Sequence, residues 1–210
     1  TAEIVGTLFT NFESAWLRLQ GEGLTQLLDL GARLSDEQIA AFLEALWEQQ
    51  REFEEEYLER DEEEFFEDND DNTLDTFQDY LGKLSDDQRQ WVHESSRGLL
   101  RSDQVWLQER ALWLTQLATL LEREPGWQQR VRAAISVRDD TVSPDYQRVY
   151  EHNMDAIYEL IAQVLNARSE RQSRYLKDKL TDIREDLETL IAQGKTDTAA
   201  QSDEPSNNRP

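Results

Sequence analysis

The sequence predicts an all-α fold, a multi-helix bundle of about eight amphipathic helices with a disordered C-terminal tail. Apolar residues recur at the three- and four-residue spacing of helices, and no segment alternates apolar and polar residues as a half-exposed strand does. Only 8 Gly and 4 Pro interrupt the 210 residues. A helix-starting phrase, Leu-Ser-Asp followed by an acidic residue and Gln, also occurs twice.

The repeated phrase predicts two helix starts. Its defining residues are Leu34, Ser35 and Gln38 in the first copy and Leu84, Ser85 and Gln88 in the second. In each copy the serine hydroxyl can accept a hydrogen bond from the backbone N–H three residues on, and the glutamine side chain can accept one from the serine N–H. This reciprocal pair is a capping box, and the preceding leucine can staple onto the first turn. A weaker third copy runs from Ser169 to Gln172.

In the first half of the chain, the apolar rhythm predicts helices over residues 1–20, 36–57 and 74–81, and residues 24–30 form a short apolar stretch that ends at Gly31. The helix that starts after Ser35 has the clearest apolar stripe, and because no Pro or Gly occurs before Gly82 it can extend past Tyr57. The very acidic stretch 54–71 is expected to end or fray near residues 69–72 and to connect this helix to the next.

In the second half, the same rhythm predicts helices over residues 85–99, 103–121, 127–137, 145–165 and 169–192. Ser102 followed by Asp103 is a further candidate N-cap, and residues 138–144 form the clearest loop. The chain is long enough for one substantial core or two small ones.

Beyond Gly194 the sequence lacks apolar anchors, which predicts disorder. We therefore expect a single α-helical domain over residues 1–193 and a disordered tail over 194–210. Because the chain starts at Thr1 without an initiator Met, we interpret the domain as trimmed at its N-terminus.

The charge balance limits the classes of partner. With 45 acidic and 22 basic residues, the formal net charge is −23. This charge argues against nucleic acid, whose binding needs a basic face that displaces counterions. It also disfavours direct attachment to anionic lipid. No run approaches the roughly 20 apolar residues that span a bilayer.

The residues that carry chemistry are few, and we expect no enzyme, no cofactor and no metal. The absence of cysteine removes disulfides, thiolate nucleophiles and cysteine-based zinc sites. The only histidines, His93 and His152, fall in different predicted helices, and the neighbouring Glu94 and Glu151 point away from them on a helix. An unrecognised hydrolase that uses one of these histidines with a carboxylate remains an alternative.

The acidic run offers a second alternative, a module that responds weakly to divalent cations through residues 62–71. The sequence from Asp68 opens like an EF-hand loop, but the glycine needed at the sixth position is Thr73. The glutamate needed at the twelfth position is Asp79. A solvated acidic helix face and connector is the simpler interpretation.

Tryptophan is the most distinctive candidate for recognition. The six tryptophans are Trp16, Trp47, Trp91, Trp106, Trp113 and Trp127. Packing at helix crossings is their ordinary role, but Trp47 and Trp113 fall beside the apolar stripes of their helices. These two are the candidate partner-binding residues, because exposed aromatic side chains anchor interfaces.

The placed motifs resemble a family of uncharacterised proteobacterial, in particular gammaproteobacterial, lipoproteins. The resemblance rests on the first phrase with Phe42 and residues 51–57, on residues 80–91 around the second phrase, on Trp106-Leu107 with Arg110, and on residues 172–190. It covers roughly residues 15–193. It implies a protein whose lipobox cysteine, and with it the lipid anchor, lies upstream of this chain. Such a protein faces the periplasm from the cell envelope, and the family offers no activity or catalytic residues to carry over.

The paired Leu-Ser-x-x-Gln phrases are also similar, more loosely, to the Leu-Thr-x-x-Gln motifs of periplasmic stress chaperones, which are helical cradles for unfolded proteins. Those chaperones carry a basic concave face, whereas this chain is strongly acidic. The resemblances together lead us to expect a non-enzymatic, lipid-anchored envelope protein that contacts a protein or peptide, with basic partners favoured by its charge. A chaperone-like binder of unfolded proteins is the third alternative.

Overall fold

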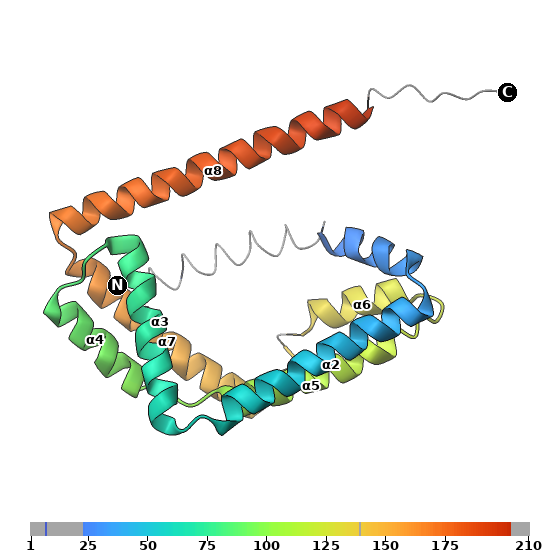
Figure 1. Ribbon diagram of the computed structural model, residues 1–210, viewed down its shortest axis with the longest axis horizontal. Coiled ribbons are helices and arrows are strands. Elements are labelled where there is room, and N and C mark those ends of the chain that lie inside the picture. The colour runs from blue at the N-terminus through green and yellow to red at the C-terminus, as the bar shows by residue number, and fades with distance from the viewer. Residues whose placement is uncertain (1–6, 8–22, 139, 203–210) are drawn as a thin grey trace.

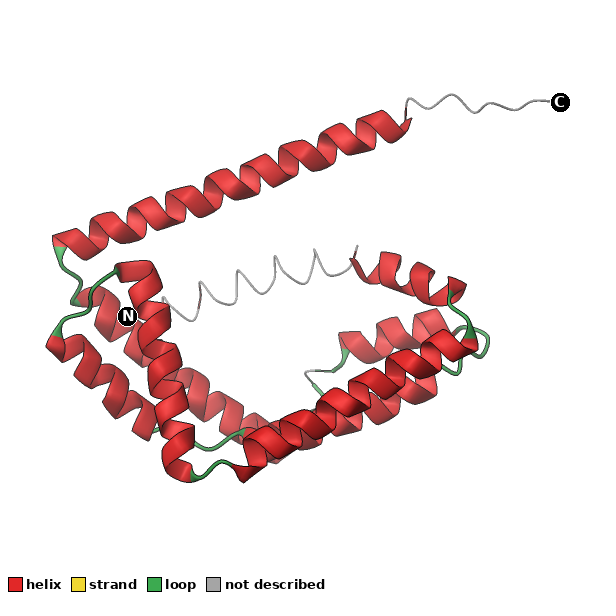
Figure 2. Cartoon of the chain, viewed as in Figure 1, coloured by secondary structure: helices red, strands yellow, loops and turns green. Residues whose placement is uncertain are grey.

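The computed structural model describes residues 7, 23–138 and 140–202, and no strand occurs among them (Figures 1 and 2). The all-α fold expected from the sequence is confirmed. Residues 23–33 are helical. The helices that follow are α2 (Asp36–Glu59), α3 (Glu62–Leu81), α4 (Asp86–Arg97), α5 (Asp103–Leu120), α6 (Trp127–Ser136), α7 (Pro144–Asn166) and α8 (Glu170–Ser202). Most of the helix predicted over 1–20, including Trp16, lies outside the described residues.

The helices form two groups that meet at an angle (Figure 1). In one group α5 lies against α2 and α6, and in the other α4 contacts α3 and α7 while α3 contacts α8. A contact between α5 and α7 joins the groups. Beyond its contact with α3, α8 leads away from the rest of the chain (Figure 1).

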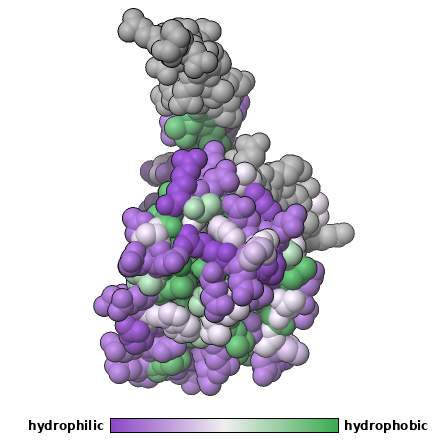
Figure 3. All heavy atoms as spheres, turned by 90° about the vertical axis from the view of Figure 1, so that its right-hand side faces the viewer, coloured by the Kyte–Doolittle hydropathy of each residue, from purple (hydrophilic) through white to green (hydrophobic). Residues whose placement is uncertain are grey.

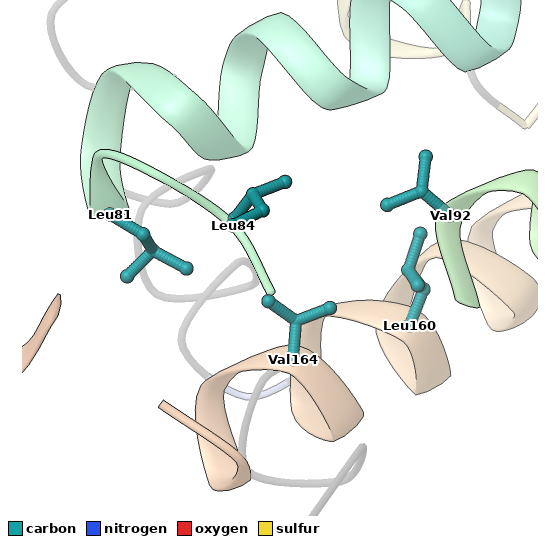
Figure 4. Close-up of a cluster of buried hydrophobic side chains, with 5 residues drawn as sticks. All are labelled: Leu81, Leu84, Val92, Leu160 and Val164. Carbon is teal, nitrogen blue, oxygen red and sulfur yellow. The ribbon is translucent and has the colours of Figure 1, made fainter. Parts of the chain in front are cut away.

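The second group has its own apolar core, in which the buried side chains of α3, α4, α7 and the turn before α4 point toward one another (Figure 4). Its buried members are Leu81, Leu84, Val92, Leu160 and Val164. Leu84 is the leucine of the second capping phrase, and it packs in this core rather than onto the first turn of α4, where the residue at the staple position is Arg89. Each such side chain stabilises the fold by roughly 1.5–3 kcal/mol on burial.

The first group has a separate, smaller core at the far end of α5. Leu28, Leu120 and Val131 are buried there, and Leu24 and Trp127 pack against them. This cluster joins helical residues 23–33 to α5 and α6. Among the described residues, two separate clusters of buried apolar side chains thus lie in the two helix groups, and further buried residues such as Leu107 and Leu114 lie outside both clusters.

Capping boxes start α2 and α4 as the repeated phrase indicates. In both, the serine Oγ accepts from the glutamine backbone N–H at 3.2 Å, and the glutamine Oε1 accepts from the serine N–H at 2.9 Å. The weaker third copy closes in the same way, between Ser169 and Gln172 at the start of α8.

The second and third boxes meet through their glutamines, which we call the glutamine pair. The Gln172 amide donates to Gln88 Oε1 at 2.8 Å and to the Lys83 carbonyl at 3.2 Å. The Gln88 amide donates to the Val164 carbonyl at 3.4 Å. Gln88 is 1% and Gln172 is 5% exposed, so both amides lie in the interior. The pair fixes the start of α8 against the start of α4 and the end of α7.

The acidic run does not fray near residues 69–72, and that expectation is wrong. The break lies earlier, at Arg60, and α3 runs unbroken from Glu62 to Leu81. A further capping box explains the difference, because Asp61 Oδ1 accepts from the Glu64 N–H and Glu64 Oε2 accepts from the Asp61 N–H, both at 2.9 Å. Acidic residues in the first turn of α3 suit the helix dipole, and Phe65 anchors that turn at 2% exposure.

Charged residues join α2, α3 and α5 at a site that we call the Asp103 junction. Asp103 is 5% exposed and accepts from Arg60 Nη2 at 2.5 Å and from Arg101 Nε at 2.9 Å. The Arg60 guanidinium also donates to Asp68 of α3 at 2.6 Å. Burial alone would lower the pKa of Arg60, but its hydrogen bonds to Asp103 and Asp68 outweigh burial and raise that pKa. Ser102 precedes α5 as expected, but its side chain makes no cap bond.

The last helix is longer than the sequence indicates. α8 continues to Ser202, past the expected end near Ala192, and residues 203–210 of the predicted tail lie outside the described residues. Its apolar stripe remains largely in solvent, as Leu180 and Leu187 are 52% and 54% exposed.

The glutamine pair predicts unequal costs for the same substitution in two copies of one motif. Gln88→Ala removes the box of α4 and leaves the Gln172 amide and the Val164 carbonyl with one partner fewer in a buried site. We expect a loss of about 2–4 kcal/mol in the free energy of unfolding, measured by urea denaturation. Gln38→Ala removes an exposed box alone and should cost about 0.5–1 kcal/mol. Equal losses of unfolding free energy in the two variants would contradict the proposed contribution of the glutamine pair.

The Asp103 junction predicts a second contrast. Asp103→Asn leaves the largely covered guanidinium of Arg60 and the more exposed one of Arg101 beside a buried neutral side chain, and we expect it to lower the free energy of unfolding by roughly 3 kcal/mol. Asp68→Asn removes the exposed partner of the same Arg60 and should cost less than about 1 kcal/mol. Thermal melts of both variants check this. A junction that does not hold α5 would give two similar, small losses.

Candidate functional site

A groove of about 660 Å³ lies where α5 faces α7 and the loop between α6 and α7. We call it the Trp113 groove. Its apolar and aromatic walls include Leu46, Trp106, Leu112, Trp113, Val142 and Tyr146. Its charged lining consists of Glu109, Arg110 and Arg138. Sites of this size accept a small ligand or a few side chains of a peptide.

The Trp113 groove exists because α5 is apolar on more than one face. Leu107 and Leu114 are buried in the interior, and α5 contacts α2, α6 and α7. Trp113 is half-buried, and Leu112 is 63% exposed, both in the lining. A leucine this exposed beside a half-buried indole gives the groove an apolar wall that water can reach.

The loop wall of the Trp113 groove is held by hydrogen bonds. The Thr141 N–H donates to the Arg138 carbonyl at 3.1 Å, and the Ser143 N–H donates to Glu109 Oε1 of α5 at 2.9 Å. Ser143 caps α7 by accepting from the Tyr146 N–H at 3.2 Å. The same short segment therefore closes the loop, starts α7 and ties both to α5.

Both arginines in the lining lie against aromatic rings. The Arg138 guanidinium is 5.1 Å from the centre of the Trp113 ring, and the Arg110 guanidinium is 5.1 Å from the centre of the Phe53 ring. Arg110 also donates to the side-chain oxygens of Gln49 and Gln50 of α2. Gln50 is 1% exposed and donates to the Leu107 carbonyl at 3.1 Å, so α2 holds Arg110 in place. These contacts hold the two positively charged guanidinium groups in defined positions in the groove.

The structure separates the two candidate tryptophans. Trp113 lines the groove and gives it its aromatic wall, whereas Trp47 is half-buried on α2 outside the lining, although its neighbour Leu46 belongs to it. Trp91 and Trp127 pack against the two apolar cores. Ser35 and Gln38, and Ser85 and Gln88, form the two capping boxes, and none of the six residues of the capping phrases lines the Trp113 groove.

The two histidines lie away from the Trp113 groove. His93 Nδ1 is 3.6 Å from Asp70 Oδ2 on the surface between α3 and α4, with 58% of the histidine side chain exposed. His152 Nε2 lies 3.0 Å from the Gly98 carbonyl. Neither residue lines the groove.

The acidic run 62–71 lies within α3, and the EF-hand-like fragment from Asp68 is part of that helix rather than a loop. No group of three or more His, Cys, Asp or Glu side chains suited to a metal occurs in the described part of the chain. Some of the acidic charge is neutralised within the chain. The hydrogen bond from Arg97 lowers the pKa of Glu63 below its ordinary value and raises the pKa of Arg97.

Sequence reasoning missed most of the Trp113 groove. It did not identify Arg138, Tyr146 or Leu46, because helical periodicity does not show which helix meets which loop. The displaced positions of Leu112 and Trp113 relative to the α5 stripe were the available signal. The face where α2 begins and α5 ends carries separate hydrophobic groups among hydrophilic ones (Figure 3).

Comparisons with known proteins give one result. A family model described as a family of unknown function (DUF6279) matches residues 4–147, which include every residue that lines the Trp113 groove. No curated protein and no solved structure matches the chain. Among the described residues, no helix is both long enough and apolar enough to cross a bilayer.

Proposed function

Since the chain belongs to DUF6279, a family of unknown function, we propose its role from its own groove: it is a non-enzymatic protein that binds a protein or peptide partner in the Trp113 groove. The observation that carries this proposal is the exposed apolar wall of Leu112 beside the half-buried Trp113. The groove then binds a partner and does not catalyse a reaction.

The composition of the Trp113 groove supports a peptide ligand. Tryptophan, tyrosine and arginine are the residues that most often carry binding energy at protein interfaces, and all three line it. An apolar partner side chain would cover Leu112 and remove water from one face of Trp113. Burial of this apolar area gives roughly 25 cal/mol per Å², while the positioned arginines orient the partner.

The location of the protein belongs to the same proposal. The resemblance to envelope lipoproteins supports a lipid-anchored protein that faces the periplasm, where the described helices contact a partner. In that arrangement the anchor supplies the membrane attachment, and the acidic surface stays in solution.

The binding role predicts a crosslink that depends on the groove. A photoreactive benzophenone amino acid in place of Leu112, in the whole protein expressed in its own cells, should capture a discrete partner. The same residue in place of Leu58, which is 48% exposed on α2 and outside the groove, should not. Gel electrophoresis after irradiation measures the adduct.

Paired tryptophan variants separate the groove from general surface contact. Trp113→Ala should reduce the adduct at position 112 about tenfold or more, because a central aromatic anchor contributes at least about 1.4–2 kcal/mol. Trp47→Ala removes a half-buried tryptophan outside the lining and should leave the adduct in place. An adduct that survives in folded Trp113→Ala protein would show that the groove is not the binding site.

Lipid anchoring predicts incorporation of labelled palmitate into the whole protein and its recovery with the membrane fraction. Substitution of the upstream lipobox cysteine should release the protein into the periplasmic fraction. A whole protein that carries no label and fractionates with the cytoplasm would rule out the proposed location, while leaving the groove to be judged by the crosslink.

A further inference from the structure

Arg138 presents a guanidinium to the Trp113 groove without an ion pair to a carboxylate of the described residues. It is exposed, lies over the Trp113 ring, and forms no ion pair with any carboxylate of the described residues. Stacking on the indole restricts the guanidinium, so less conformational entropy is lost when its N–H groups meet a ligand. A carboxylate is the group that its planar fork matches best.

Arg110 adds a second positive charge to the same lining. It stacks on Phe53, and its N–H groups donate to neutral amide oxygens of Gln49 and Gln50, so among the described residues its charge is not cancelled by a carboxylate ion pair. The amides hold the guanidinium in place but leave its full positive charge. Its field adds to that of Arg138 across the groove.

The one acidic group in the lining does not reverse this balance. Glu109 accepts the Ser143 N–H at 2.9 Å and so has a structural task at the start of α7. Among the described residues, the charged lining therefore sums to one positive charge, two arginines against one glutamate, on a chain whose net charge is −23. The described lining thus differs in sign from the chain as a whole.

Local charge outweighs the total charge at such a site. At physiological salt the Debye length is about 8 Å, so most of the acidic surface is screened from a ligand in the groove. Charges that touch the ligand are screened much less. The net charge favours basic partners in the first encounter, whereas the groove favours an acidic group in the final contact.

We propose, on the basis of the proposed function, that the occupant of the Trp113 groove is a peptide segment in which an acidic residue lies next to a large apolar residue. Its carboxylate pairs with Arg138, with Arg110 as the supporting charge, and its apolar side chain covers Trp113 and Leu112. The partner segment is therefore acidic, whereas the net negative charge of the chain alone would favour a basic partner.

A phage-displayed library of random dodecapeptides, selected on the folded chain at physiological salt, tests this assignment. We expect enriched peptides in which Asp or Glu lies next to an aromatic or aliphatic residue. Synthetic copies should bind Arg138→Gln about tenfold more weakly, because a charge-assisted pair is lost, and should bind Trp113→Ala more weakly still. The control is Arg148→Gln, on α7 outside the lining and with its side chain 65% exposed, which should bind normally.

The outcomes separate the two levels of the proposal. Peptides that are neutral or basic, and that lose affinity for Trp113→Ala but not for Arg138→Gln, would retain the binding groove and overturn its acidic ligand. Peptides indifferent to Trp113→Ala, or no enrichment at all, would overturn the groove itself. Arg138 lies in a loop and is exposed, so circular dichroism should show Arg138→Gln folded as the parent.

Discussion

Asp103 is the buried carboxylate on which the arrangement of the two helix groups depends. Arg60 at the end of α2 and Arg101 before α5 both donate to it, and Arg60 also reaches Asp68 of α3. Two guanidiniums around one carboxylate leave one positive charge in excess, which Asp68 balances. The interaction is strong because it is buried, and it fixes where α5 starts relative to the helices on either side.

The geometry of the Trp113 groove depends on the fixed position of the start of α5. α5 runs from the Asp103 junction past Gln50 of α2. The Gln50 amide donates to the Leu107 carbonyl, so α2 holds one face of α5 in place before the helix reaches the groove. Glu109 on the same helix then holds the start of α7 through the Ser143 N–H. One helix thus carries the junction, the aromatic wall and the support of the opposite wall, which explains why the Trp113 groove lies along it.

Local chemistry made most of the fold predictable. Capping residues placed the starts of α2, α4 and α8 because the bonds that define them lie within four consecutive residues. The break at Arg60 was missed because Asp61 and Glu64, which form a capping box, stand within a run of similar acidic residues. Trp113 was identified from its displaced position, whereas Arg138 was not, since its contact with Trp113 joins positions that are remote in the sequence. Reversal of charge within the groove is likewise a property of tertiary contacts, which total composition conceals.

The glutamine pair has a consequence for the order in which the chain folds. Gln172, which closes the first turn of α8, finds its buried partner Gln88 at a separation of 84 residues along the chain. Closing so long a loop costs entropy that only the completed second core can offset. We therefore expect the start of α8 to form after α3, α4 and α7 have assembled. An ordered start of α8 is therefore a sign that α3, α4 and α7 have already packed together, because the start forms only once their core is complete.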